Sequence, residues 1–293
     1  MAHTHHHHDN KSEGNIRVAF FLNLSFTIIE IIGGLWTNSI AILSDALHDF
    51  GDSLSLGVSW YFAKLSQKES NQKFSYGYTR FSVLGALINS VVLITGSIFI
   101  VVEAFPRLLN PISPETEGMI YLAIGGVIVN GAAALRLSRG KSLNEKAVYT
   151  HLLEDILGWV AVLIGAIVMH YWDFPIIDPV LSVLIAGYIL YNVFKNLKES
   201  FQIILQGTPS DVSVKKIHEV IMDIPQVKAV HDCHTWSMDG TYHILSIHLA
   251  IEKDLQLSEL QGIKKEAKSR MSALGINHTT IEFETLNEEC DPC

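Results

Sequence analysis

Four residues in two apolar segments have the types and the spacing of a metal site. His48 and Asp52 lie four residues apart in one apolar segment, and His151 and Asp155 repeat this spacing at the start of another. Residues four apart share one face of a helix, so each segment presents one imidazole and one carboxylate together. Two such pairs supply four nitrogen and oxygen ligands, the number and type that tetrahedral Zn²⁺ accepts, whereas Ca²⁺ takes six or more oxygens.

The segments that carry these pairs are typical of membrane-spanning helices. Charged residues make up only 17% of the chain, against roughly 25% in a soluble domain. Three stretches contain at most one charged side chain and approach the length that spans a bilayer, and three others are long and apolar but interrupted by a few charges. The six predicted spans cover residues 16–36, 40–63, 81–105, 118–135, 156–172 and 176–194.

The intramembrane position makes the two pairs informative. A charged side chain at mid-bilayer costs about 2.5 to 3.5 kcal/mol on insertion scales, so these residues need partners. Hydrogen bonds or ion pairs between helices are one alternative, but the duplicated spacing favours a bound metal. Asp45 and Asp49 are also four apart; we expect Asp45 to be a cap or entrance residue, and Asp49 could equally face a neighbouring helix. The polar residues expected to form helix–helix hydrogen bonds are Asn23, Glu30 and Asn130.

The distribution of charge predicts the topology. Basic residues gather in the connections after the second and fourth spans, so the positive-inside rule puts both termini in the cytoplasm. Residues 1–15 contain no apolar run, and we therefore expect no signal peptide. The net charge of −9 and the absence of a basic patch argue against nucleic-acid binding.

The composition changes to that of a soluble domain near Gly207-Thr208-Pro209. An αββαβ order in the tail favours a small α+β domain with an antiparallel sheet covered by helices on one face. Its predicted elements are a helix capped by Ser210 or Asp211, strands at 227–236 and 242–251 around an Asp239-Gly240 turn, a helix at 258–273 and a strand at 279–286. The predicted parts are a His-rich tail (1–14), a six-helix transmembrane domain (15–207), a cytoplasmic domain (208–287) and a Cys-x-x-Cys tail (288–293).

Several features together resemble one known family. They are the six spans, the two His-x-x-x-Asp pairs, the FSYGYTRFSVLGALIN run at 74–89 and the VHDCHTW run at 230–236. Over nearly the whole chain these features resemble the cation diffusion facilitator family, on its zinc-transporter branch. The resemblance implies that the two pairs form the transport site of a homodimer. It also implies a ferredoxin-like cytoplasmic domain and export of zinc in exchange for protons.

Antiport is consistent with the chemistry of the ligands. Imidazole and carboxylate must be deprotonated to bind metal, so metal and protons compete for the same lone pairs. Helices that rock around a midplane site would then expose it to each side in turn. Some family members carry a further His between spans two and three. Because this chain has Tyr76 and Tyr78 there, we expect interfacial aromatics and no metal site.

Further metal candidates lie on the cytoplasmic side. His231, His248 and Glu284 fall on three different predicted strands, at positions comparable to the regulatory metal sites of the family. A lone His on a strand is more often structural, and only the resemblance favours these three. Nearby alternatives are His234, His243 and His278.

The chain ends in a Cys-x-x-Cys motif. In a reducing compartment the thiolates of Cys290 and Cys293 bind zinc more readily than they form a disulfide. Further donors could come from the histidines at 3 and 5–8, since His-rich tracts bind metals, or from a second protomer. A frayed tail with no bound metal is the equal alternative.

These observations favour a proton-coupled zinc exporter in a bacterial inner membrane. We expect no enzymatic activity and no cofactor, because zinc is the transported substrate and also a regulatory ligand. One alternative is an intramembrane zinc hydrolase, but the chain lacks a motif such as His-Glu-x-x-His that puts a general base beside the metal. Another is a metal-gated channel or sensor, in which the tail domain binds the metal and the spans respond.

Overall fold

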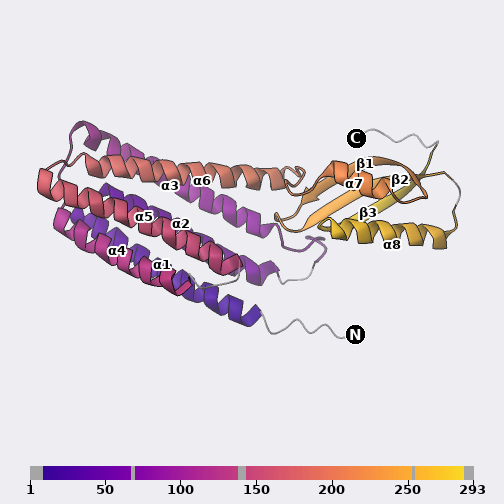
Figure 1. Ribbon diagram of the computed structural model, residues 1–293, viewed down its shortest axis with the longest axis horizontal. Helices are drawn as coiled ribbons and strands as arrows, with labels where there is room; N and C mark the ends of the chain where they lie inside the picture. The colour runs from indigo at the N-terminus through magenta and orange to yellow at the C-terminus, as the bar shows by residue number, and fades with distance from the viewer. Residues whose placement is uncertain (1–8, 67–69, 138–142, 253–254, 287–293) are drawn as a thin grey trace. The chain divides into compact units, whose positions relative to one another are not determined.

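Six long helices precede a small α+β domain in the computed structural model, which describes residues 9–66, 70–137, 143–252 and 255–286 (Figure 1). The predicted spans are confirmed as helices, which extend past most of the apolar windows. The helices are α1 (Asp9–Thr37), α2 (Ile40–Ser66), α3 (Phe81–Leu109), α4 (Thr116–Leu137), α5 (Leu143–Trp172) and α6 (Ile177–Ile204).

Many large apolar side chains are exposed on the helices, among them Phe99, Tyr121 and Leu184. Within the described residues, α3, α4, α5 and α6 are long and apolar enough to cross a membrane by length and composition alone. Helix α2 differs because it carries Asp45, Asp49 and Asp52 close together. Half of the predicted site, His48 and Asp52, therefore lies on one of the most polar of the long helices.

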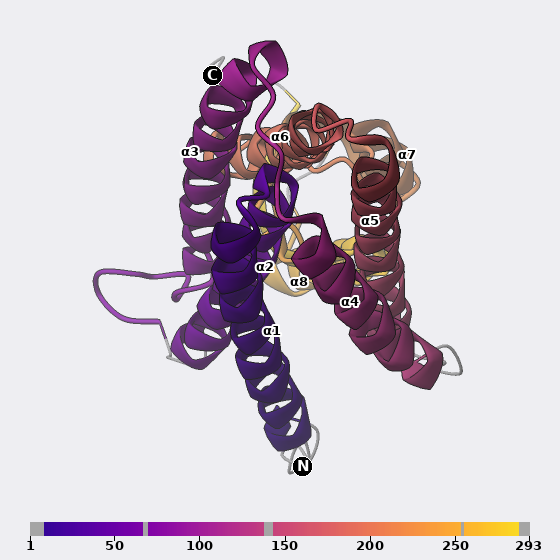
Figure 2. The same cartoon turned by 90° about the vertical axis from the view of Figure 1, so that its left-hand side faces the viewer.

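Trp159 of α5 is the centre of one helix packing cluster. Its side chain is buried together with Ile42 of α2 and Met119 of α4, and the ring of Phe26 from α1 meets it edge-on at 6.0 Å. Figure 2 shows α4 and α5 side by side. A Cβ atom at Gly126 of α4 would lie only 2.3 Å from the Trp159 ring. Glycine is therefore required there for the close approach of these two helices.

The first turn of α2 is capped by a residue from another helix. The carboxylate of Asp178 on α6 accepts hydrogen bonds from the Ser39 hydroxyl at 2.5 Å, the Ile40 amide at 2.9 Å and the Ala41 amide at 3.2 Å. This carboxylate is 1% exposed. It satisfies orphan amides that every helix start leaves unpaired. The expectation that Asp45 could cap α2 is therefore wrong, because the helix begins earlier and takes its cap from α6.

The tail domain has the predicted order of elements. They are α7 (Val214–Met222), β1 (Val227–Ser237), β2 (His243–Ile251), α8 (Leu257–Ala273) and β3 (Ile276–Thr285). The Asp239-Gly240 hairpin is confirmed: Asp239 Oδ1 accepts from the amides of Thr241 and Tyr242, and Gly240 has a φ of +94°.

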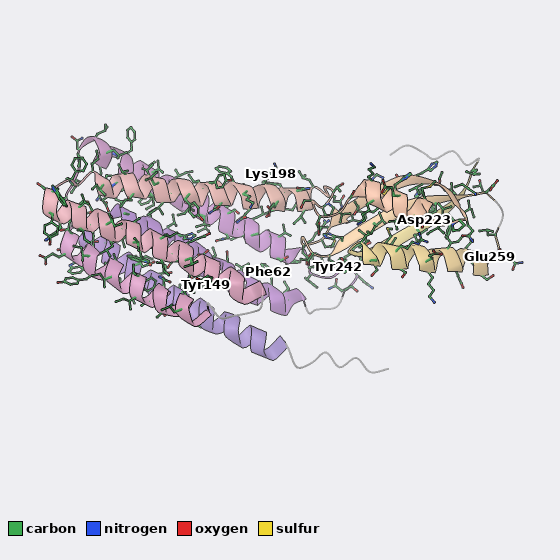
Figure 3. All side chains as sticks on the ribbon, in the orientation of Figure 1. Phe62, Tyr149, Lys198, Asp223, Tyr242 and Glu259 are labelled. Carbon is green, nitrogen blue, oxygen red and sulfur yellow. The ribbon has the colours of Figure 1, made fainter. Side chains whose placement is uncertain are left out.

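The helix α7 starts later than predicted. Its N-cap is Ser213, whose hydroxyl accepts a hydrogen bond from the Lys216 amide. The predicted caps Ser210 and Asp211 were wrong because each lies before the first helical turn. At the other end, Asp223 follows α7 (Figure 3) and accepts a hydrogen bond from Arg270 of α8 at 3.0 Å.

The sheet has the order β1-β2-β3 but is mixed. Strands β1 and β2 pair antiparallel, whereas β2 and β3 pair parallel. The prediction of an antiparallel sheet was wrong for β3, because α8 carries the chain back along the sheet before β3 begins, as a crossover to a parallel strand requires. On β2, Leu245, Ile247 and Leu249 pack into the core with the helices. Alternation along the strand therefore leaves His248 on the opposite face.

The Asp178 cap is open to a direct test. Replacing Asp178 by Ala leaves a hydroxyl and two amides without their acceptor in a buried position, and each unsatisfied group costs about 1–3 kcal/mol. We expect a clear fall in the melting temperature of the detergent-solubilised protein, measured by tryptophan fluorescence. The exposed Glu199→Ala, on the same helix, should leave that temperature unchanged. Equal melting temperatures for both variants would contradict the proposed role of the cap.

Candidate metal centres

The His48–Asp52 pair lies on one face of α2, as predicted. The imidazole Nε2 of His48 is 3.8 Å from Oδ2 of Asp52, and the two side chains are 21% and 28% exposed. They are therefore neither sealed in the core nor fully open. One imidazole and one carboxylate at this separation can take a metal ion with a modest movement of either side chain.

Carboxylates from α2 and α5 approach each other near this pair. Asp45 of α2 interacts electrostatically with both Asp52 and Asp155. Its Oδ1 atom is 3.5 Å from the place that a Cβ would take at Gly158, one turn beyond Asp155 on α5. Asp45 is 6% exposed, so it faces α5 inside the bundle. The acidic residues of the two helices thus share one region.

The fourth residue of the predicted site is less fully defined. His151 lies in α5 one turn before Asp155, but its side chain is outside the described residues. Within the described part, no three His, Cys, Asp or Glu side chains are already grouped as ligands of one metal ion. The four-ligand site therefore stays a prediction, supported by the His48–Asp52 pair and by the approach of α5.

A second polar contact links α2 to α1. The side-chain amide of Asn23 donates hydrogen bonds to the carbonyl of Asp49 at 2.8 Å and to the hydroxyl of Ser53 at 3.0 Å. The predicted helix–helix hydrogen bond of Asn23 is therefore confirmed. The same prediction was wrong for Asn130, which donates to the Gly126 carbonyl of its own helix at 3.1 Å. An amide four residues after a carbonyl can bond within the helix and needs no neighbour.

The cytoplasmic candidates centre on His248. Across the sheet, His248 pairs with His231 on β1 and with Glu282 on β3. Its Nδ1 contacts Oε1 of Glu284, and its Nε2 lies 3.4 Å from Asp232 and 3.6 Å from Glu282. The structure therefore brings His248 and Glu284 together as predicted. His231 is the exposed neighbour of His248 on the next strand.

Asp232 and Glu282 are members of this cluster that the sequence analysis missed. Asp232 has a φ of +44° at an irregularity of β1 between His231 and His234. The bulge directs its carboxylate to both His234, at 2.6 Å, and His248. Glu282 could have been predicted, because it lies two residues before Glu284 and residues two apart share one face of a strand. No sequence signal marks the bulge that redirects Asp232.

The other candidates lie elsewhere. His243 is buried, with Nε2 3.1 Å from Asp211, and His278 meets the ring of Tyr76 edge-on at 5.8 Å. Tyr76 was expected to be an interfacial aromatic and instead contacts a strand residue of the tail domain. Cys290, Cys293 and the N-terminal histidines lie outside the described residues.

Cys233 tests the electrostatics of the His248 cluster. Burial, and to a lesser degree the charge of Asp232, raises the pKa of this thiol. Because less thiolate is present at a given pH, iodoacetamide should label Cys233 more slowly at neutral pH than it labels glutathione, as followed by peptide mass spectrometry. Asp232→Asn should speed the labelling, because it removes the negative charge that adds to the effect of burial on the thiol pKa. Labelling of the native thiol faster than glutathione would contradict this electrostatic description.

Comparisons with known proteins agree with this architecture. Residues 16–205 match the cation efflux transmembrane domain, and residues 209–286 match the cytoplasmic domain of cation efflux proteins. The chain is 33% identical to the cadmium, cobalt and zinc/H(+)-K(+) antiporter of Bacillus subtilis, over 96% of this chain and 92% of that protein. It is 32% identical to the metal cation efflux system protein CzcD of Cupriavidus metallidurans, over 95% and 89% of the two chains.

A third relative extends the match over the whole chain. The zinc transporter ZitB of Pectobacterium atrosepticum is 32% identical over 100% of this chain and 92% of its own length. The matched domains and relatives are metal transporters rather than enzymes, which excludes the intramembrane hydrolase. The chain is therefore an integral membrane protein for metal cation efflux, and it belongs to the cation diffusion facilitator family, on its zinc, cadmium and cobalt efflux branch.

Proposed function

We propose that this chain exports zinc from the cytoplasm in exchange for protons through a tetrahedral site between α2 and α5. The proposed ligands are His48, Asp52, His151 and Asp155. The main support is the His48–Asp52 pair, 3.8 Å apart on one face of α2, together with the electrostatic link that Asp45 makes to both Asp52 and Asp155. Two nitrogens and two carboxylate oxygens suit Zn²⁺ and also tolerate Cd²⁺ or Co²⁺.

The exchange follows from the protonation chemistry of these ligands. Zinc binds the neutral imidazole and the ionised carboxylate, so protons leave when the metal enters and return when it departs. A site that opens to one side at a time then couples the two flows in opposite directions. The relatives from two Bacillus species are named as H(+)-K(+) antiporters, which favours exchange over simple leakage.

The proposed setting is a homodimer in a bacterial inner membrane, with both termini in the cytoplasm. The basic residues in the connections after α2 and α4 support this orientation by the positive-inside rule. The match of residues 209–286 to a cytoplasmic domain agrees with it. The apolar outer faces of the helices, such as Phe99 and Val102 of α3, would face lipid or the second protomer.

We further propose that the tail domain binds a regulatory zinc ion at His231, His248 and Glu284, with Asp232 and Glu282 beside them. One imidazole already contacts three carboxylates there, so a cation is attracted to the cluster. Cys290 and Cys293 are proposed as ligands of a separate cytoplasmic zinc ion, on the strength of their spacing alone.

Zinc flux into proteoliposomes tests the transport site and its coupling. We expect native flux to increase under an imposed pH gradient. Asp52→Ala and Asp155→Ala should each abolish it, since either change removes one of four ligands. The matched control is Asp223→Ala, outside the helical bundle. Flux unaffected by both ligand substitutions would refute the site, and flux that ignores the gradient would indicate a channel.

Zinc-dependent stabilisation tests the cytoplasmic site. A ligand that binds only the folded state raises its stability by about 2.7 kcal/mol at a hundred times its dissociation constant. We expect zinc to raise the melting temperature of the Asp52→Ala, Asp155→Ala protein, and His248→Ala to reduce that rise. His278→Ala, on the same sheet, should keep it. An undiminished rise in the His248 variant would exclude this cluster as a zinc site.

A further inference from the structure

The turn between α2 and α3 has a defined fold. The side-chain oxygen of Asn71 accepts hydrogen bonds from the amides of Lys73 and Phe74, both at 2.9 Å. The ring of Phe74 lies 5.4 Å from that of Phe81, the first residue of α3. The turn therefore folds back, so that Lys73, beside Phe74, lies near the start of α3.

Arg80, the last residue before α3, has no partner for its charge in the described part of the chain. Its Nε atom is buried and has no hydrogen-bond partner. The arginines of the described ion pairs differ, because Arg107 pairs with Glu103 at 3.3 Å and Arg270 with Glu266 at 2.6 Å. A guanidinium has five N–H donors, and a buried donor without an acceptor is unfavourable. Arg80 therefore lacks an acceptor that a ligand could supply.

The charge of the whole connection indicates the sign of that ligand. Residues 64–80 contain four basic residues and one acidic residue. Lys73, whose side chain is exposed, adds its positive charge on the same turn as Arg80. Like charges repel and opposite charges attract. The ligand is therefore an anion, and a metal ion is excluded.

The apolar surroundings indicate which kind of anion. Phe74 is 40% exposed and Leu84, one turn into α3, is 47% exposed. Because α3 is long and apolar enough to cross a membrane, Arg80 lies where the span meets the polar connection. Aromatic side chains are enriched at this level, between hydrocarbon and headgroups. A phospholipid offers a phosphate to Arg80 and acyl chains to the apolar side chains, whereas a free anion offers only the first.

We propose that Lys73 and Arg80 bind the phosphate group of an anionic phospholipid at the start of α3. A guanidinium can donate two parallel hydrogen bonds to one phosphate, and the ammonium of Lys73 adds a second positive charge. This site goes beyond the proposed zinc transport and depends only on the membrane setting of the chain.

The position of the turn gives a bound lipid a consequence. The turn joins α2, which carries His48 and Asp52, to α3. A phosphate held at Arg80 would keep the start of α3 at the level of the headgroups. It would thereby restrain the end of α2 that follows the proposed zinc ligands.

Native mass spectrometry of the detergent-solubilised full chain tests this site, because it counts the phospholipids bound to each chain. The protein is titrated with phosphatidylglycerol, which is anionic, and with phosphatidylcholine, whose headgroup has no net charge. One basic residue near a membrane surface contributes about fivefold to the affinity for anionic lipid. We expect the native chain to prefer phosphatidylglycerol. Arg80→Gln should lower that affinity about fivefold or more, and Lys73→Gln should lower it by a smaller factor.

The matched control is Lys198→Gln, which removes the same charge from an exposed position on α6 (Figure 3). It should keep the native affinity, and a fall equal to that of Arg80→Gln would overturn the proposal, because total charge would then attract the lipid. Arg80→Lys keeps the charge but loses the paired donors, so its affinity should lie between those of the native chain and Arg80→Gln. Should Arg80→Gln fail to accumulate, native affinity in both Arg80→Lys and Lys73→Gln contradicts the site.

Two further outcomes would give Arg80 another partner and overturn the proposal. Displacement of phosphatidylglycerol by inorganic phosphate at equal concentration would identify a free anion as the ligand. A dimer that dissociates in Arg80→Gln, with the number of lipids per chain unchanged, would place Arg80 in the contact with a second copy. These measurements need no zinc, so failure of the lipid site leaves the proposed transport function intact, and failure of zinc flux leaves the lipid site intact.

Discussion

A membrane interior excludes charge, and the rest of this structure depends on how the retained charges are compensated. Asp178 is buried but accepts three hydrogen bonds at the start of α2. Its charge is thereby used to hold two helices together. Asp52 and His48 are a compensated pair of opposite potential charge. The buried side chain of Glu30 on α1 meets that of Asp49 instead. The bundle therefore contains one carboxylate satisfied by amides, one pair suited to a metal and one pair of carboxyl groups that joins α1 to α2.

The tail domain also separates charged from apolar side chains, but its charged residues can face water. There the sheet separates its residues by alternation, with Leu245, Ile247 and Leu249 in the core and His248 on the other face. Charge is permitted on that face, so three carboxylates can gather around one imidazole at little cost. A cation that binds this cluster would reduce the repulsion between its carboxylates, and it would reach them from water. Such a cluster suits sensing, whereas the intramembrane residues suit transfer.

Sequence periodicity was sufficient for the helices, the tail-domain order and the His-x-x-x-Asp faces, because each follows from local spacing. Contacts between segments that are far apart in the chain could not be predicted from local spacing. The cap of α2 comes from Asp178, far along the chain, and the parallel pairing of β3 depends on how α8 crosses the sheet. The Asp232 bulge has no compositional signal. Glu30 was recognised as polar and intramembrane, but its meeting with Asp49 depends on the rotation of two helices.

That rotation is itself determined by identifiable contacts. Along α2, acidic or ligand residues at 45, 48, 49 and 52 make a broad polar face, and a helix of this kind has no single orientation dictated by hydrophobicity alone. Asp178 holds its first turn and Asn23 holds the carbonyl of Asp49. With both contacts in place, Asp45 faces α5 at Gly158 while Asp49 faces α1. A small rotation of α2 would therefore move carboxylates from one neighbour to the other, so the two anchors decide which acidic side chains of α2 face α5 and which face α1.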